Sequence, residues 1–211
     1  LTKILMSVLK EMNLSSEQFR VVVFGSARIK PEDILYKEVY KIGYKVGELG
    51  SDLVTGGGPG LMDAANKGHK EATPNPENTS KSIGIRIQLP FEEEDSGNLD
   101  LKVDFKTFAK RLDAFMEISD MIIVTPGGVG TLLEMAYTWQ LIQVGHLKKI
   151  PIVLVGEQWN SFYKWASKNI IDLNFANKED LDILIPVPDF DSALTLIESY
   201  HDKYQEKLIN S

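Results

Sequence analysis

The sequence contains no cysteine among its 211 residues. This absence excludes a disulfide scaffold, a cysteine-based zinc site, a thiol nucleophile and a cysteine-ligated cluster within the chain. Histidine is also scarce: His69, His146 and His201 are far apart, and none belongs to an H-E-x-x-H motif or an i, i+4 pair. We therefore expect no metal site, and any catalysis would use carboxylates and arginines.

Positive charge is in deficit, because 23 Lys and Arg residues face 30 Asp and Glu residues, which gives a formal net charge of −7. The basic residues form no block, so we expect no nucleic-acid partner. Long apolar runs are missing too: residues 150–155 form a strongly apolar run far shorter than the ~20 residues that span a bilayer. We expect no membrane partner and a cytoplasmic protein.

The first residues, 1–12, mix apolar side chains with Lys3, Lys10 and Glu11. This mixture predicts a short amphipathic helix rather than the uninterrupted apolar core of a signal peptide. With roughly 150 residues per domain as a guide, the chain is expected to form one domain over 1–211, with residues 1–19 as a helical N-terminal extension.

Short β-branched runs alternate with amphipathic stretches along the chain. Strands are predicted at residues 20–24, 52–55, 82–87, around Val103, and at 121–125, 152–155 and 183–187. Helices are predicted over about 31–49, 61–72, 106–118, 131–144, 158–171 and 191–207, with Pro31 at a first helical position, Gly50 as a stop and Asp191 as an N-cap. This alternation predicts a Rossmann-like, doubly wound α/β fold, in which helices cover both faces of a parallel sheet.

Two polar stretches interrupt this pattern. Residues 73–80 (TPNPENTS) predict an exposed loop. Residues 92–95 (EEED) form an acidic run with no defined ligand spacing, which is typical of a solvated loop rather than a cation site. We assign no chemistry to either stretch.

Three predicted strand-to-helix turns carry small residues: G-S-A-R at 25–28, G-G-G-P-G at 56–60 and P-G-G-V-G-T at 126–131. In a parallel sheet all three turns lie at the carboxyl edge, where ligands bind and where helix N-termini present N–H groups to anions. A single glycine turn indicates only a tight connection. Three at one edge favour a ligand that carries a phosphate.

The familiar nucleotide and nucleophile motifs are absent. No G-x-x-x-x-G-K-[ST] occurs, which disfavours a P-loop enzyme, and no G-x-S-x-G elbow occurs. The nearest approach to a dinucleotide fingerprint, Gly128-Val129-Gly130, has Leu133 where the third glycine belongs. A redox dinucleotide is therefore disfavoured.

The third turn continues as P-G-G-V-G-T-L-L-E at residues 126–134, and the second as G-G-G-P-G-L-M at 56–62. With this pair of motifs the chain resembles the Lonely Guy family of nucleoside 5′-monophosphate phosphoribohydrolases, whose members were long labelled possible lysine decarboxylases. The resemblance extends over about residues 21–155. One departure concerns substrate range, because many members have Arg-Lys where this chain has Arg111-Leu112.

The resemblance implies a Rossmann-like homodimer or assembly of dimers without a cofactor. It also implies hydrolysis of AMP or of N6-modified AMP, such as cytokinin ribotides, to the free base and ribose 5-phosphate. Matched by motif, Glu134 would be the catalytic carboxylate and Arg111 its partner. The residues expected to bind the phosphate or nucleotide are Gly127, Gly128, Val129, Gly130, Thr131, Gly57, Gly58, Ser26 and Arg28.

A carboxylate suits this chemistry, because cleavage of a ribosyl bond develops positive charge on the sugar, and a carboxylate can stabilise that charge, bind a ribose hydroxyl or activate water. Arg111 could bind the phosphate and keep Glu134 ionised. The four residues Thr131-Leu132-Leu133-Glu134 also match a capping box, in which Thr131 caps a helix and Glu134 bonds back to it. The preceding glycines favour the catalytic interpretation.

The sequence leaves two alternatives to nucleotide hydrolysis. The same pocket could bind a nucleotide or a pterin-type cofactor, such as the molybdenum cofactor, without turnover. The presence of both Arg111 and Glu134 favours catalysis over pure binding. Amino-acid decarboxylation is suggested only by the old family label, since the sequence shows no recognisable lysine site for pyridoxal phosphate.

Overall fold

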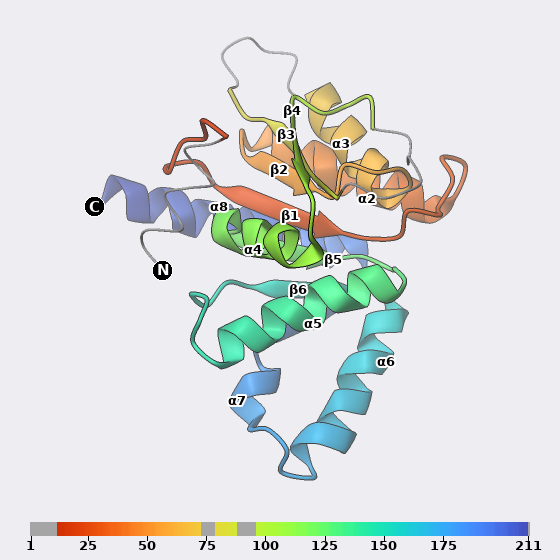
Figure 1. The fold of residues 1–211 in the computed structure, drawn as a ribbon, viewed down its shortest axis with the longest axis vertical. Helices are drawn as coiled ribbons and strands as arrows, with labels where there is room; N and C mark the ends of the chain where they lie inside the picture. The colour runs from red at the N-terminus through yellow and green to blue at the C-terminus, as the bar shows by residue number, and fades with distance from the viewer. Residues whose placement is uncertain (1–11, 73–78, 88–95, 211) are drawn as a thin grey trace.

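The computed structural model describes residues 12–72, 79–87 and 96–210. Its centre is a seven-stranded, all-parallel sheet in the order β4-β3-β2-β1-β5-β6-β7 (Figure 1). The strands are β1 (Arg20–Phe24), β2 (Asp52–Thr55), β3 (Ser82–Ile87), β4 (Leu101–Phe105), β5 (Met121–Val124), β6 (Ile152–Val155) and β7 (Leu184–Val187). The chain builds outward from β1 to β4 and then returns to place β5 on the other side of β1. The predicted single-domain, doubly wound fold is confirmed.

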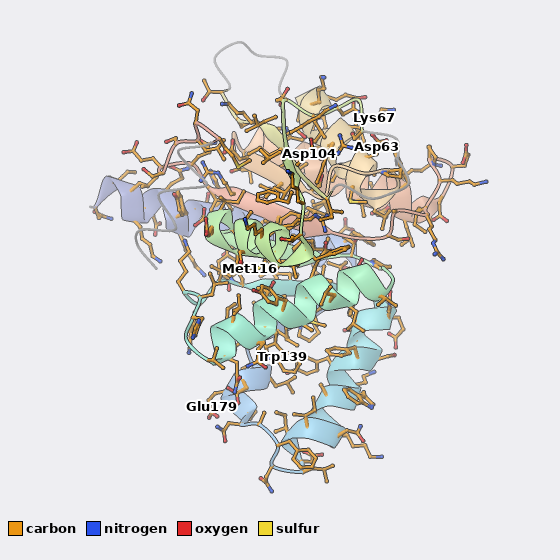
Figure 2. The ribbon with its side chains drawn as sticks, viewed as in Figure 1. Asp63, Lys67, Asp104, Met116, Trp139 and Glu179 are labelled. Carbon is orange, nitrogen blue, oxygen red and sulfur yellow. The ribbon has the colours of Figure 1, made fainter. Side chains whose placement is uncertain are left out.

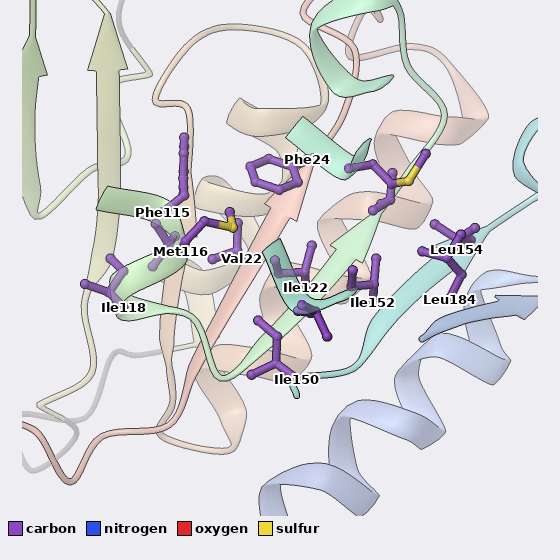
Figure 3. Packing of buried hydrophobic residues seen from close by; sticks show 14 of the residues in the cluster. Val22, Phe24, Phe115, Met116, Ile118, Ile122, Ile150, Ile152, Leu154 and Leu184 are labelled. Atoms are coloured by element: carbon purple, nitrogen blue, oxygen red, sulfur yellow. The ribbon is translucent and has the colours of Figure 1, made fainter. Parts of the chain in front are cut away.

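Helices cover both faces of this sheet (Figure 1). One face carries α2 (Ile34–Glu48), α3 (Leu61–Ala72) and α8 (Phe190–Ile209); the other carries α4 (Phe108–Ile118), α5 (Val129–Gln143), α6 (Glu157–Ala166) and α7 (Lys178–Leu181). Alternation along β1 separates the two cores, because successive side chains of a strand point to opposite faces. Val21 and Val23 pack with α2 and α3, whereas Val22 and Phe24 pack against Phe115 of α4 (Figure 3).

The central strands are apolar and buried on both faces, which is the pattern of a parallel sheet between two helical layers. On the α5 side, Trp139 donates its indole N–H to the carbonyl oxygen of Asp180 at 2.6 Å and so joins α5 to α7 (Figure 2). The sheet and its covering helices therefore hold the ends of β1 and β5 in place from both sides.

Several helix boundaries differ from the predictions. Helix α2 begins at Ile34 with Asp33 as its N-cap, so Pro31 precedes the helix rather than opening it. The N-cap of α8 is Asp189, whose carboxylate accepts the N–H of Ser192 at 2.8 Å, and the prediction of Asp191 as the cap was wrong. Asp191 lies in the first turn of α8, where its negative charge still interacts favourably with the helix dipole.

The predicted helix over 158–171 is two elements, because α6 ends at Ala166 and a π-helix follows over Ser167–Ile171. Residues 1–11 of the predicted N-terminal helix, residues 73–78 and the acidic run 92–95 lie outside the described residues. Residues 12–19 form turns and irregular backbone. Within the described ranges, no helix is both long enough and apolar enough to span a bilayer.

Candidate active site

The strand order reverses between β1 and β5, and in open parallel sheets this switch point is where ligands bind. The turns that follow the two strands are bonded to each other: the N–H of Ser26 donates to the carbonyl of Pro126 at 3.1 Å, and the hydroxyl of Thr125 donates to the carbonyl of Phe24 at 2.9 Å. Gly25 permits this approach, because a Cβ at that position would lie 2.3 Å from Thr125 Oγ1.

The turn after β2 approaches the same point. The N–H of Leu61, at the start of α3, donates to the carbonyl of Ser26 at 2.9 Å. Gly60 has a φ of +72°, and a Cβ there would lie 2.4 Å from the carbonyl oxygen of Ser26. Only glycine fits this position without strain. The three glycine turns thus meet at one edge, as predicted from the sequence.

A cavity of about 480 Å³ lies where these turns meet, a size within the range of small-molecule sites. Eight of the predicted site residues line it: Ser26, Arg28, Arg111, Gly128, Val129, Gly130, Thr131 and Glu134. Gly25, Ala27 and Met62 also line it, although they were not among the predicted site residues. The structure therefore brings together residues from the turn after β1 and from α3, α4 and the start of α5.

Three predicted phosphate-binding glycines do not line this cavity: Gly57, Gly58 and Gly127. The N–H of Gly57 donates to the hydroxyl of Thr55 at 3.0 Å, and its carbonyl accepts from the N–H of Ser96 at 3.2 Å. The N–H of Gly127 donates to Oε1 of Gln158 at 3.0 Å. Gly57 and Gly127 therefore shape the turns but have already used the N–H groups that a phosphate would need.

Helix α5 begins at Val129, two residues earlier than predicted, with Gly128 as its N-cap and no side-chain cap. Thr131 is thus the third helical residue, so the capping-box alternative was wrong. The N–H of Leu132 makes the bond to the Gly128 carbonyl, at 3.0 Å. Val129, Gly130 and Thr131 line the cavity, and their N–H groups come before the first helical hydrogen bond, so no helical carbonyl accepts them. The positive end of the helix dipole at this point favours an anion.

Arg111 is held from several directions inside the site. Its Nε donates to the carbonyl of Ile85 at 2.8 Å, and its Nη1 donates to Oε1 of Glu134 at 3.1 Å. Its guanidinium carbon lies 5.0 Å from the ring centroid of Phe115, one turn along α4. Gly56 lets it fit, because a Cβ there would lie 2.5 Å from Nη2. These contacts together orient the guanidinium toward Glu134.

Glu134 is largely buried, with 13% of its side chain exposed. Burial raises the pKa of its carboxyl from 4.5 to about 7, against the opposing effect of the Arg111 charge. A carboxyl group that titrates near neutral pH in a cavity is typical of a functional site. Beside the uncapped start of α5, this pair offers an anion site and a proton acceptor together.

Neither a metal centre nor a second ligand cavity competes with this site among the described residues. Within the described residues, no group of three or more His, Asp or Glu side chains is arranged to hold a metal ion. A larger hollow of about 720 Å³ lies at the amino edge of the sheet, lined by residues that include Phe19, Asp120 and Lys148. It contains no glycine turn, and ligands of such sheets bind at the carboxyl edge. The smaller cavity is therefore the candidate active site.

Fold and site define a Rossmann-like protein with a helix start that no side chain caps beside an Arg-Glu ion pair. The family model described as "Possible lysine decarboxylase" matches residues 62–197, and the chain belongs to this family, which includes the Lonely Guy proteins. A pyrimidine/purine nucleotide 5′-monophosphate nucleosidase of Escherichia coli K12 is 27% identical over 170 residues. The match covers 77% of this chain but 37% of that relative, so the chain spans well under half of its length.

Solved structures with the same fold include a molybdenum cofactor binding protein from Rippkaea orientalis, with a TM-score of 0.64 and 22% identity over 88% of this chain and 98% of that one. A molybdenum cofactor carrier protein from Chlamydomonas reinhardtii has a TM-score of 0.61 and 21% identity, covering 87% of this chain and 98% of that one. At these identities the similarity establishes the fold alone.

Proposed function

We propose that this chain hydrolyses the N-glycosidic bond of nucleoside 5′-monophosphates, of AMP type, to a free base and ribose 5-phosphate. The observation that carries the proposal is the buried Glu134–Arg111 pair on the same cavity as the uncapped start of α5. The E. coli relative is a nucleosidase of pyrimidine and purine nucleotide 5′-monophosphates, which supports the same substrate class. Family membership supports the reaction over binding alone.

Under this proposal each part of the cavity has a role. The 5′-phosphate binds the N–H groups at the start of α5, and exposed Arg28 adds positive charge at the rim. Anchoring the phosphate places the ribose against Glu134. The bonding electrons of the N-glycosidic bond leave with the base, and a water oxygen bonds to C1′. Glu134 stabilises the sugar cation or accepts the proton from water, and in either case the proton that water loses ends on the departing base.

The direct test is incubation of the purified protein with AMP and with N6-prenylated AMP, followed by chromatography for free base and ribose 5-phosphate. Adenosine, which lacks the phosphate anchor, is the matched control and should react with a kcat/KM at least about 100-fold lower. Absence of base release from both nucleotides would contradict the proposal. Tight binding of a nucleotide or pterin without turnover would instead support a carrier of the same fold.

The pH dependence of the reaction follows from Glu134. If the carboxylate is the active form, kcat/KM should rise about tenfold per pH unit below pH 7 and level off above it, because the pKa of this group is raised to about 7. Initial rates between pH 5 and 9, with stability checked at each pH, measure the profile. A profile that stays flat down to pH 5 would show that ionised Glu134 is not required.

We also propose that the chain forms a homodimer through the outer face of α5. Glu134 is the one Asp, Glu, Lys or Arg residue within α5, and it points to Arg111 rather than to solvent. The exposed face consists of Val129, Leu132, Leu133 and Val144 with uncharged neighbours. A helix that is apolar all round is normally covered, so a second copy on this face would remove these side chains from water.

Substitution Leu133→Asp should turn the dimer into a monomer, since it places a charge in the middle of the apolar face. Light scattering coupled to gel filtration would measure the mass of both forms. Ile34→Asp is the matched control, because Ile34 is also exposed but lies on α2, on the other side of the sheet. A monomeric wild-type chain, or equal masses for both variants, would rule out this interface.

A further inference from the structure

Gln158, the second residue of α6, makes two hydrogen bonds to a single residue of the turn after β5. Its Oε1 accepts the N–H of Gly127 at 3.0 Å, and its Nε2 donates to the carbonyl of Gly127 at 2.7 Å. The two residues are 31 positions apart in the sequence. Gln158 therefore binds the backbone of the turn as a neighbouring strand would, although its side chain is exposed.

The rest of this turn is held in the same way. Trp159, which follows Gln158 and is buried, donates its indole N–H to the carbonyl of Thr125 at 3.0 Å. The carbonyl of Pro126 accepts the N–H of Ser26 at 3.1 Å. The carbonyls of residues 125, 126 and 127 thus each accept a hydrogen bond from outside the turn, two of them from the start of α6.

This arrangement matters for an anion at the start of α5. Peptide units that contain glycine rotate freely, so the consecutive glycines Gly127 and Gly128 would otherwise sample orientations that aim a carbonyl oxygen at the ligand. A carbonyl held by a partner cannot turn toward the anion. Because Gln158 also occupies the N–H of Gly127, this group is not offered to the cavity, whereas Gly128, Val129, Gly130 and Thr131 at the start of α5 line it.

We propose that Gln158 is a positioning residue that fixes the turn at residues 126–128 so that the start of α5 is preorganised for the substrate phosphate. This inference rests on the proposed function, since it names a determinant of phosphate binding at that same site. Gln158 does not line the cavity, so its effect passes through Gly127. Preorganised donors bind an anion without a reorganisation cost on each binding event.

The test compares Gln158→Leu with Ser161→Ala. Leucine has a similar size but makes neither bond, and Ser161 is an exposed residue of the same helix whose hydroxyl donates to Oε1 of Glu157, also in α6, at 3.3 Å. Calorimetry with ribose 5-phosphate gives Kd, and steady-state rates with AMP give KM and kcat. For Gln158→Leu we expect Kd and KM to rise about tenfold, kcat to change less than about threefold, and Tm to stay within about 2 °C.

A second readout follows the turn directly. Amide hydrogen exchange at Gly127 should be slow in the wild type and in Ser161→Ala, and at least about tenfold faster in Gln158→Leu. An unchanged Kd for ribose 5-phosphate in Gln158→Leu, or a lowered Tm with unchanged Kd and KM, would overturn the positioning role. So would failure of the wild type to bind ribose 5-phosphate.

The two proposals fail in different ways. If the wild type binds ribose 5-phosphate but does not cleave AMP, the hydrolase proposal fails, and the ratio of Kd values between wild type and Gln158→Leu still decides the role of Gln158. If the wild type cleaves AMP and the two Kd values agree, the hydrolase proposal stands and the role of Gln158 is refuted.

Discussion

Replacing Glu134 with glutamine should lower kcat/KM for AMP by about 10³-fold, the range lost when a group that acts in proton transfer is removed. The melting temperature should stay within about 3 °C of wild type. Glutamine has the same length, and its Oε1 can accept the same bond from Nη1 of Arg111 that the carboxylate accepts at 3.1 Å. The change therefore removes the charge while it keeps the local packing.

The pH dependence of the free energy of unfolding separates the effect of the Glu134 charge from the effect of its packing. The pKa of Glu134 is raised in the folded protein from 4.5 to about 7, so between these values the folded state keeps a proton that the unfolded state has lost. The stabilisation from this group is complete below about pH 4.5 and is lost as the pH rises to about 7. Denaturant titrations should show wild type losing stability relative to Glu134→Gln across this window.

Retention of full activity by Glu134→Gln would refute the catalytic role, because a neutral amide can neither carry the charge nor accept a proton in the same way. A large loss of stability would be equally informative. It would mean that the ion pair with Arg111 holds α4 against α5, and the lost activity could not then be ascribed to chemistry.

Replacing Arg111 with methionine should have the largest combined effect. Breaking a buried ion pair leaves Glu134 without its partner and typically costs about 3 kcal/mol, or roughly 10 °C in melting temperature for a chain of this size. The carbonyl of Ile85 also loses its donor. Activity should fall by at least about 100-fold, since both a cavity charge and the position of Glu134 are lost.

The double variant Arg111→Met, Glu134→Gln should be more stable than Arg111→Met alone, because it has no buried charge without a partner. Wild type, the two single variants and the double variant form a double-mutant cycle. Their thermal unfolding is compared at pH 8, where wild-type Glu134 is mostly ionised. Additive changes would show that the two side chains do not interact, which would contradict the 3.1 Å contact between Nη1 and Oε1.

The sequence predicted the strands well because a parallel sheet covered on both faces needs continuous apolar strands, and such runs stand out. Helix starts were predicted less well. A residue caps a helix only if its own backbone is non-helical, usually extended, and several polar residues near a start compete for that role. Thus Asp189 rather than Asp191 caps α8, and Gly128 rather than Thr131 precedes α5.

At the candidate site, too, some residues were predicted from the sequence and others were not. Glu134 and Arg111 were identified through motifs, and the structure places them 3.1 Å apart although 23 positions separate them. Gln158 was missed, because nothing local distinguishes it from any exposed glutamine on a helix. Its partner Gly127 lies in the turn after β5, whereas Gln158 lies in α6 after β6. The two residues meet only once β5 and β6 are paired.

By itself the sequence determined the alternation of strands and helices, the three glycine turns and the residue types available for chemistry, because these depend on local periodicity and composition. Only the tertiary structure decided which glycines still have free N–H groups, how deeply Glu134 is buried and what raises its pKa to about 7. Burial and hydrogen-bond partners come from segments distant in the chain. No local pattern encodes them.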